Sequence, residues 1–314
     1  MALVTEGRQK TRVGDGVLIV NKEAGWTSHD VVAKVRGLLG GAKVGHAGTL
    51  DPAATGVLPL LIGKATRVAE YLVGWDKEYR AVLRLGETTD TQDATGTVLQ
   101  RVETAGVSAE ILDGVVARFR GQQKQMPPMY SAVKVAGRPL YKAARAGETV
   151  ERAERDIVIH ELEVTAVDGR DIALRIVCSK GTYIRTLCAD MGQALGVGGH
   201  LLSLERTRVG SLTIEQGLTV EQITAHVTIG SIESKLLTLD QVLAQLPLVT
   251  VTTEQATRVL HGASIGLPHD LSPTSSPIRL KDEQGRLLAI GTYDGQGKGS
   301  VRIDKVLVDS ESLN

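Results

Sequence analysis

Cysteine is almost absent from this sequence of 314 residues, in which Cys178 and Cys188 are the only two. Two thiols can build neither a disulfide framework nor a zinc site with four cysteine ligands. Both lie in apolar patterns, so we expect buried free thiols in a reducing compartment. The sequence also contains no nucleotide-binding fingerprint and no spaced cluster of metal ligands. We therefore expect a protein that uses neither a cofactor nor a metal ion.

Long apolar runs are missing as well. None approaches the roughly 18 residues that a membrane-spanning helix needs, and the N-terminal residues contain no apolar core of signal-peptide length. We therefore expect a cytoplasmic protein without membrane contact. The hydrophobic fraction of 42% and the charged fraction of 23% are ordinary for a globular protein. The length suffices for one large domain and a smaller one.

Net charge is also lacking, because 36 basic residues balance 36 acidic ones. Taken alone, this balance argues weakly against a nucleic-acid partner, which usually requires a basic surface. Residues 118–152 depart from the balance, with eight basic and two acidic side chains and hence a net charge of +6. The basic ones are Arg118, Arg120, Lys124, Lys134, Arg138, Lys142, Arg145 and Arg152. We expect phosphate contacts in this segment.

Glycine, by contrast, is abundant in residues 45–67, which begin Gly-His-Ala-Gly-Thr-Leu-Asp-Pro. Pro52 disfavours helical dihedrals at Asp51, so the carboxylate is presented from an extended or turn conformation. An isolated Leu-Asp-Pro is more often a simple turn. Four polar side chains accompany this acid: His46, Thr49, Thr55 and Arg67. A simple turn does not need them, and the glycines allow the backbone to approach a ligand closely.

Hydrophobic periodicity predicts strands at residues 16–22, 77–85, 172–178 and 202–208, and helices that begin at Thr27, Ser108, Thr219 and Thr238. Another helix is expected after the turn at residues 179–181, with Ile184 and Leu195 on its apolar side. A further short helix is expected at residues 68–72, and residues 88–96 are expected to form a polar loop. Residues 122–147 contain prolines and poor periodicity, so we expect an exposed, mobile excursion. Residues 1–15 are expected to be a loose terminus. Beyond residue 247, short strands and one helix at 254–260 predict a small β-barrel-like domain.

Several motifs occur together along the chain. Residues 76–79 read Asp-Lys-Glu-Tyr, residues 127–132 read Pro-Pro-Met-Tyr-Ser-Ala, and residues 178–185 read Cys-Ser-Lys-Gly-Thr-Tyr-Ile-Arg. With the glycine-rich stretch and the first strand, they closely resemble the TruB family of tRNA pseudouridine synthases, bacterial type, over roughly residues 14–245. The one departure at the motif is Ala47, where many relatives have threonine.

The resemblance implies an α/β (α+β) fold with a mixed, largely antiparallel central sheet and flanking helices. Residues 16–246 would form the catalytic domain, with an RNA-binding lid at about 122–147, and residues 247–314 a PUA-like RNA-binding domain. The implied reaction is isomerisation of uridine 55 in the T-loop of tRNA to pseudouridine, which requires no redox change. The expected partner is the T-arm of tRNA, bound by a monomer without an obligatory protein partner.

The resemblance also implies roles for three catalytic residues. Asp51 would attack the sugar C1′ or the base C6, or would take a sugar proton in a glycal route. Arg185 would form the ion pair that keeps a buried Asp51 charged, although periodicity alone equally allows a surface arginine. Tyr79 would stack on the extruded uracil, whereas its strand pattern alone favours core packing; its hydroxyl is a further candidate for proton transfer at C5.

Other residues are implied to bind RNA or to line the pocket. His46 would fill the place that the flipped base vacates or would stack within the T-loop, and Leu204 would wall the uracil pocket unless it is simply a core residue. Lys22 would support the loops of the site or cap a strand end. The remaining candidates are Gly48 and Thr49 for close approach of RNA, Tyr183 as a buttress beside Arg185, and Lys134 and Arg138 for phosphate contacts in the lid.

Two alternative functions stay open from the sequence. One is a guide-RNA-dependent pseudouridylase that acts on ribosomal RNA, and the other is a non-catalytic protein that binds or folds tRNA. The basic excursion favours an enzyme that acts alone, because such an enzyme must bind the RNA stem itself. The presence of Asp51, Tyr79 and Arg185 together speaks against a non-catalytic protein.

Overall fold

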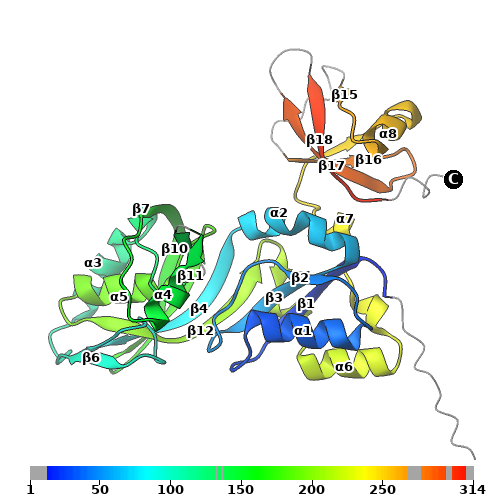
Figure 1. Cartoon of the computed structure of the whole chain (residues 1–314). Coiled ribbons are helices and arrows are strands. Elements are labelled where there is room, and N and C mark those ends of the chain that lie inside the picture. Colours follow the sequence, from blue (N-terminus) through cyan, green and yellow to red (C-terminus); the bar gives the residue numbers. More distant parts are fainter. Residues whose placement is uncertain (1–12, 132, 136, 268–276, 295–298, 309–314) are drawn as a thin grey trace, which may run out of the picture.

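The computed structural model describes residues 13–131, 133–135, 137–267, 277–294 and 299–308. Two sheets organise this part of the chain: a nine-stranded sheet flanked by helices, and a five-stranded sheet that begins after residue 247 (Figure 1). The predicted fold class, a mixed sheet with flanking helices plus a small β domain, is confirmed. The predicted loose terminus lies, as far as residue 12, outside the described residues.

The central sheet is antiparallel at every neighbouring pair along its main path except one. That exception is the parallel contact of β3 and β12, where Glu205 is paired with Thr55. In order across the sheet, the strands are β1 (Gly16–Lys22), β3 (Thr55–Ile62), β12 (Gly199–Val209), β4 (Lys77–Leu85), β11 (Asp171–Cys178), β10 (Arg155–Asp168) and β7 (Gly121–Gln125). Two short strands extend it: β2 (Val44–His46) beside β3 and β13 (Leu212–Thr213) beside β12.

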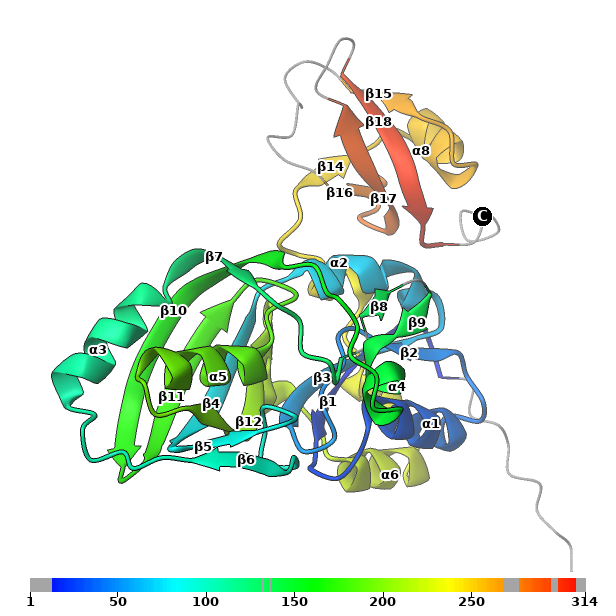
Figure 2. The ribbon, with the colours of Figure 1, turned by 60° about the vertical axis from the view of Figure 1, so that its left-hand side comes forward.

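Helices cover the two halves of this sheet separately. Figure 2 shows α3 and α5 over the half that contains β10 and β11, and α1 and α6 beside β1. The helices are α1 (Ser28–Leu38), α2 (Ala69–Gly74), α3 (Ala109–Arg118), α5 (Ile184–Ala194), α6 (Val220–Thr228) and α7 (Leu239–Val242), with 3-10 turns η1 (Gly63–Val68), η2 (Ile214–Gln216) and η3 (Ile232–Lys235). The capping boxes predicted at Thr27, Thr219 and Thr238 are present and set the helix starts.

Each half of the sheet has its own hydrophobic core. Tyr79, Ala81 and Leu83 alternate along β4 into the core under α3 and α5, as the period of two predicts. A second core lies under α1 and α6 and contains Leu50. Leu204 of β12 packs against both cores. The site therefore forms where the two halves of the sheet meet.

Two segments differ from their predictions. Residues 88–96 are not only a loop, because a hairpin of β5 (Glu87–Thr89) and β6 (Val98–Arg101) frames them. Strands of three and four residues are too short to show an alternating pattern. The excursion, in turn, begins at residue 126, because residues 122–125 are paired with β10 as part of β7. This edge strand reads Gly-Gln-Gln-Lys-Gln, so no hydrophobic pattern marks it.

The excursion contains structure of its own. It includes β8 (Lys134–Val135), β9 (Arg138–Pro139) and helix α4 (Leu140–Arg145), on which Leu140 is only 1% exposed. Figure 2 shows the segment leaving the end of β7 and crossing in front of the central sheet. Three prolines and short elements hide this arrangement from a periodicity analysis.

The C-terminal sheet has a separate core and a defined junction with the rest. Its strands are β14 (Leu248–Thr250), β16 (Ile278–Lys281), β17 (Leu287–Asp294), β18 (Ser300–Val306) and β15 (Ile265–Gly266), with helix α8 (Thr253–Leu260) packed on them. At the junction, the buried Arg279 forms an ion pair with Asp240 at 2.8 Å and donates to the carbonyl of Leu246 at 3.1 Å. No helix among the described residues is long and apolar enough to cross a membrane.

Candidate active site

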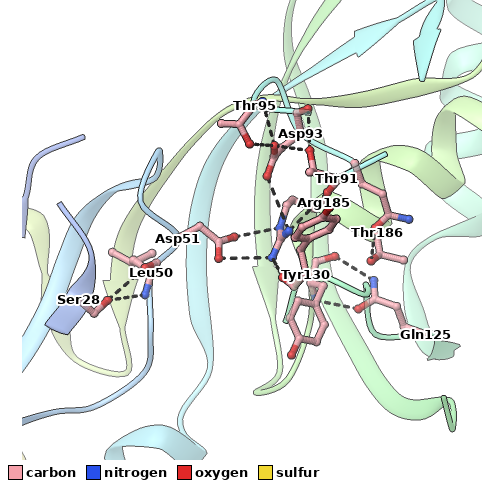
Figure 3. Close-up of polar contacts among 12 residues, drawn as sticks. Ser28, Leu50, Asp51, Thr91, Asp93, Thr95, Gln125, Tyr130, Arg185 and Thr186 are labelled. Atoms are coloured by element: carbon pink, nitrogen blue, oxygen red, sulfur yellow. Dashed lines mark hydrogen bonds and ion pairs between the residues drawn. The ribbon is translucent and has the colours of Figure 1, made fainter. Parts of the chain in front are cut away.

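The loop between β2 and β3 places Asp51 at the junction of the two half-sheets. Leu50 anchors this loop in the core, where it is 3% exposed. The hydroxyl of the buried Ser28 accepts a hydrogen bond from the Leu50 amide at 2.9 Å and donates one to the Leu50 carbonyl at 3.1 Å (Figure 3). The Ser28 side chain thus pairs with both the amide and the carbonyl of Leu50, the residue before Asp51, which in a sheet would be paired with a neighbouring strand.

Asp51 and Arg185 form the ion pair that the sequence analysis predicted. The Nε of Arg185 lies 3.0 Å from Oδ2 of Asp51, and Nη2 lies 3.4 Å from Oδ1 (Figure 3). Arg185 is the second residue of α5, and its side chain is 6% exposed, whereas that of Asp51 is 41% exposed. The buried arginine therefore holds a carboxylate that still has an open side.

The same guanidinium also contacts two segments that sequence analysis did not connect with it. Its Nη1 lies 3.7 Å from a carboxylate oxygen of Asp93 and donates to the carbonyl of Thr91 at 3.4 Å. Its Nη2 donates to the carbonyl of Tyr130 at 2.8 Å. Tyr130 belongs to the excursion, so Arg185 links the catalytic candidate Asp51 to the base of the predicted lid.

Asp93 is held by its own turn. Its carboxylate accepts hydrogen bonds from the hydroxyls of Thr91 at 2.7 Å and Thr95 at 2.6 Å. Gln92, between them, has a φ of +62° and accepts a hydrogen bond from Thr186 at 2.9 Å. An acid flanked by threonines at this spacing is the sequence signal of such a side-chain-stabilised turn. That signal does not indicate which distant residue the acid faces.

The charges around Asp51 act in opposite directions on its pKa. Burial raises the pKa of this carboxyl above its ordinary value, and the nearby Asp93 raises it further. Arg185 opposes the increase most strongly, and Lys22 adds to that opposition. Burial removes part of the water that would otherwise stabilise the charged carboxylate. The ionised state of Asp51 therefore depends on these two cations.

Lys22 lies beneath the loop and is fully buried. Its ammonium donates to the carbonyls of Glu23 at 3.0 Å, Trp26 at 2.8 Å and Pro52 at 3.2 Å. Burial lowers the pKa of Lys22 to about 8 from 10.5, against the opposing effect of Asp51. Lys22 thus supports the loop, the first of its two predicted roles, and presents no surface to RNA in this structure.

Tyr79 lies on β4 with its side chain in the core, 8% exposed. Burial raises the pKa of its phenol to about 12, so the hydroxyl keeps its proton near neutral pH. The core packing that its strand pattern favours is therefore observed, and stacking on a base stays a prediction. Leu204, half-buried on the neighbouring strand β12, packs against the same core.

His46 ends β2 and packs edge-to-face against His29, with ring centroids 5.6 Å apart. Its Nδ1 is buried without a hydrogen-bond partner among the described residues. Burial lowers the pKa of this imidazole, which favours its neutral form. Next to it, Gly48 has a φ of +95°, a conformation that favours glycine, and Thr49 is exposed at the rim.

Tyr183, which directly precedes α5, is fixed by Gln125 at the end of β7. The side-chain amide of Gln125 accepts from the Tyr183 amide at 2.8 Å and donates to its carbonyl at 3.0 Å (Figure 3). The guanidinium of Arg155 lies 5.5 Å from the centroid of the Tyr183 ring. These contacts fix Tyr183 two residues before Arg185, and its role as a buttress stays a prediction. Gln125 is a residue of this region that sequence analysis missed.

The basic residues of segment 118–152 lie on different elements and have different partners. Arg120 follows α3 and donates twice to the carbonyl of Leu162, at 2.8 and 3.0 Å. Lys134 and Arg138 lie in the excursion, where Arg138 pairs with Glu148 at 2.6 Å and both partners are half-exposed. Among the residues that the structure describes, no group of three or more potential ligands could hold a metal ion.

Comparisons with known proteins agree with this geometry. Residues 36–184 match the model of the N-terminal domain of TruB family pseudouridylate synthases, and residues 185–250 match the model of the tRNA pseudouridylate synthase B C-terminal domain. A tRNA pseudouridine synthase B of Thermobifida fusca is 45% identical over 88% of this chain and 94% of its own length. That of Ectopseudomonas mendocina is 42% identical over 95% and 96%.

Solved structures with the same fold include a chain of a Cbf5-Nop10-Gar1 complex. It superposes with a TM-score of 0.76 at 27% identity, over 94% of this chain and 86% of that one. A chain of an H/ACA RNP bound to a substrate RNA that contains 2′-deoxyuridine has a TM-score of 0.71 at 26% identity, over 93% and 85%.

Proposed function

Since this chain belongs to the TruB family of pseudouridylate synthases, we propose that it isomerises uridine 55 in the T-loop of tRNA, with Asp51 as the reacting carboxylate. The observation that carries the proposal is the pairing of a partly open Asp51 with a buried Arg185. A carboxylate held in this way is anionic, oriented and accessible from one side.

The reaction breaks the bond from N1 of uracil to C1′ and forms one from C5 to C1′, while the proton on C5 is replaced by one on N1. Asp51 has three routes to begin it: attack at C1′, attack at C6, or removal of a sugar proton. Each route needs the anion, which Arg185 and Lys22 favour. Because no atom is gained or lost, the protein's own residues are sufficient to hold and move the base.

The surroundings of Asp51 suit an extruded base. Tyr79 and Leu204, on the adjacent strands β4 and β12, are the proposed apolar walls of the uracil pocket. A neutral His46 and the exposed Thr49 lie at the rim, where the vacated stack would be filled. Lys134 and Arg138 of the excursion are the proposed phosphate contacts.

The substrate is the point on which the alternatives differ. The structural neighbours at 26–27% identity come from complexes of several proteins or with RNA, whereas the sequence relatives at 42–45% identity are named tRNA pseudouridine synthase B. We therefore favour a tRNA substrate and an enzyme that acts as a monomer without guide RNA or protein partner. The C-terminal sheet is proposed to bind RNA as a PUA-like domain.

One experiment tests the proposal. Purified protein alone is incubated with an unmodified tRNA transcript, and pseudouridine at position 55 is measured. The wild type is expected to form it, and Asp51→Asn to form none; Asp113→Asn, on the exposed face of α3, is the matched control and should react normally. A wild type without product contradicts the proposed function, and product from Asp51→Asn contradicts the assigned role of the carboxylate.

A further inference from the structure

A second buried cation near the site, besides Lys22, is Arg206 on β12. Its side chain is the largest that is fully buried, with 1% of the residue exposed, and no carboxylate pairs with it among the described residues. Its Nε donates to the carbonyl of Val57 at 2.8 Å, and Nη2 donates to that of Gly48 at 2.9 Å. Its register partner across the sheet is Tyr79 on β4, so the guanidinium and the phenol lie beside one another in the core.

These three contacts join the loop of Asp51 to the tyrosine of the site. Gly48 and Val57 lie on the two sides of Asp51 in the chain, three residues before it and six after it. The start of β3, directly after the loop, also packs on the backbone of the arginine: a Cβ on Gly56, which has a φ of +99°, would lie 2.2 Å from the carbonyl oxygen of Arg206. Arg206 therefore fixes both ends of the loop with its side chain and its main chain.

A hydrogen bond between the guanidinium of Arg206 and the phenol of its register partner Tyr79 can have only one direction. A guanidinium only donates, so the phenol oxygen would accept, and the phenol hydrogen would be left to point elsewhere. Tyr79 would thereby be held as a donor for a group other than Arg206. A buried apolar side chain of similar volume would avoid the cost of an unpaired buried charge, but it would leave the carbonyls of Gly48 and Val57 without this donor.

That cost extends to neighbouring residues. Burial is the main reason that the pKa of Lys22 and that of Lys77 fall to about 8, and the charge of Arg206 lowers both further. Three buried cations in one region oppose folding, and they satisfy backbone carbonyls there that an apolar side chain would leave unpaired. The arrangement is costly for a purely structural support.

We propose that Arg206 is a positioning residue for the isomerisation, which aligns the Tyr79 hydroxyl and the Asp51 loop in one geometry. This inference rests on the proposed function. It assigns a part in the chemical step to a side chain that touches neither solvent nor RNA. Arg206 acts through Tyr79 and through the Gly48 carbonyl.

The test separates chemistry from binding and from folding. Arg206→Lys and Arg206→Met are compared with wild type by the single-turnover rate constant with enzyme in excess, by the Kd for the tRNA transcript and by the Tm. Loss of charge-assisted hydrogen bonds at the site predicts a rate constant about 100-fold lower for Arg206→Met. Arg206→Lys, which keeps a donor, should recover part of the rate, and the Kd should change less than about 3-fold in both.

A double-mutant cycle with Tyr79→Phe tests the proposed route. If Arg206 acts through the phenol, Arg206→Met costs much less rate in the Tyr79→Phe background than in wild type. The matched control is Arg208→Lys, two residues along the same strand, whose guanidinium pairs with Glu78 at 3.4 Å and is partly exposed; its rate should be near that of wild type.

Three outcomes would overturn the inference. The first is an unchanged rate constant for Arg206→Met. The second is a loss of rate and of tRNA affinity by equal factors, accompanied by a lower Tm, and the third is a double-mutant cycle in which the effects of Arg206→Met and Tyr79→Phe on the rate are fully additive. If Arg206→Met does not fold, Arg206→Lys decides, because a lower rate constant with unchanged Kd and Tm supports the inference and an unchanged rate contradicts it. Failure of the proposed function itself is distinguishable, since the wild type would then form no pseudouridine.

Discussion

The two segments that border Asp51 are fixed in different ways. The loop of residues 47–54 is held from beneath by buried polar side chains: Ser28 on the backbone of Leu50, Lys22 on the Pro52 carbonyl and Arg206 on the Gly48 carbonyl. The excursion of residues 126–147 is tied to the rest of the protein near its base, where Arg152 donates to the Pro127 carbonyl at 2.8 Å and Arg185 to that of Tyr130.

This difference matches the tasks proposed for the two segments. A reacting carboxylate gains most when its position is fixed before the substrate arrives, because reorganisation then costs nothing in the transition state. A segment that contacts phosphates can adjust to the RNA backbone if it is free to move, although ordering the segment on binding then costs conformational entropy. Arg185 contacts both segments, so the largest effects are expected from changes to its side chain.

The first prediction removes that shared contact. Arg185→Gln should lower the single-turnover rate constant at least about 100-fold, because a partly buried carboxylate loses its cation. The pKa of Asp51 is raised by burial and lowered by Arg185, so without Arg185 it rises further. Activity should therefore disappear at a higher pH on the acid side.

The pH profile of the single-turnover rate constant checks this prediction. Arg185→Lys keeps the charge and serves as the control, with a smaller displacement of the acid limb. An acid limb at the wild-type pH in Arg185→Gln would show that the cation does not control the protonation of Asp51.

The second prediction concerns the buried support of the loop. The pKa of Lys22 is about 8 in the folded protein and 10.5 in the reference state, so the unfolded chain binds more protons between these values. The free energy of unfolding should therefore rise with pH across that window, through Lys22 alone by on the order of 3 kcal/mol. Lys22→Met should lose this part of the rise.

Urea unfolding of both proteins at several pH values provides the measurement. The difference between the two curves removes the contributions of other groups, such as Lys77, whose pKa is also lowered to about 8. A constant difference from neutral to alkaline pH would mean that the ammonium of Lys22 is not buried as charged support.

The third prediction removes the excursion without disturbing the sheet. Gln125 and Arg155 are paired at the ends of β7 and β10, so an Asn-Gly turn in place of residues 126–154 would close them as a hairpin. The Tm should change little, while the affinity for tRNA should fall by roughly 10-fold or more at moderate salt.

Filter binding over a salt series tests the electrostatic part of this prediction. The slope of log K against log salt should become less steep by about 0.9 for each phosphate contact that is lost. A shortened protein with the wild-type slope would exclude phosphate binding by the excursion. A collapse in Tm would mean instead that the excursion is part of the fold.

The sequence is a good guide to this structure where a pattern repeats along the chain. Tyr79, Ala81 and Leu83 alternate because one face of β4 is buried, and Thr27 begins α1 because its side chain caps the helix. The pairing of Asp51 with Arg185 was predictable only from the resemblance to a family, since 134 residues separate them. Local periodicity carries no information about such contacts.

The residues that escaped prediction share a physical reason. Asp93, Gln125 and Arg206 are polar side chains whose partners are backbone carbonyls, amides or charges from distant segments. A glutamine that satisfies the backbone of Tyr183 looks like any other glutamine of an exposed edge strand. Alternation places Arg206 on the same strand face as Leu202 and Leu204, but it does not reveal that the guanidinium is completely buried with backbone carbonyls as its acceptors.

The smallest effect is expected from single charges of the excursion. Lys134→Ala should weaken tRNA binding about equally for different transcripts and reduce the salt slope by about 1, because one phosphate contact is lost. Lys124→Ala, an exposed lysine on β7, is the matched control with the same change in net charge. If both variants reduce the slope equally, tRNA binding depends on the overall charge of the protein and not on the position of the excursion. The contrast between a fixed loop and an adaptable RNA-binding segment would then rest on the loop alone.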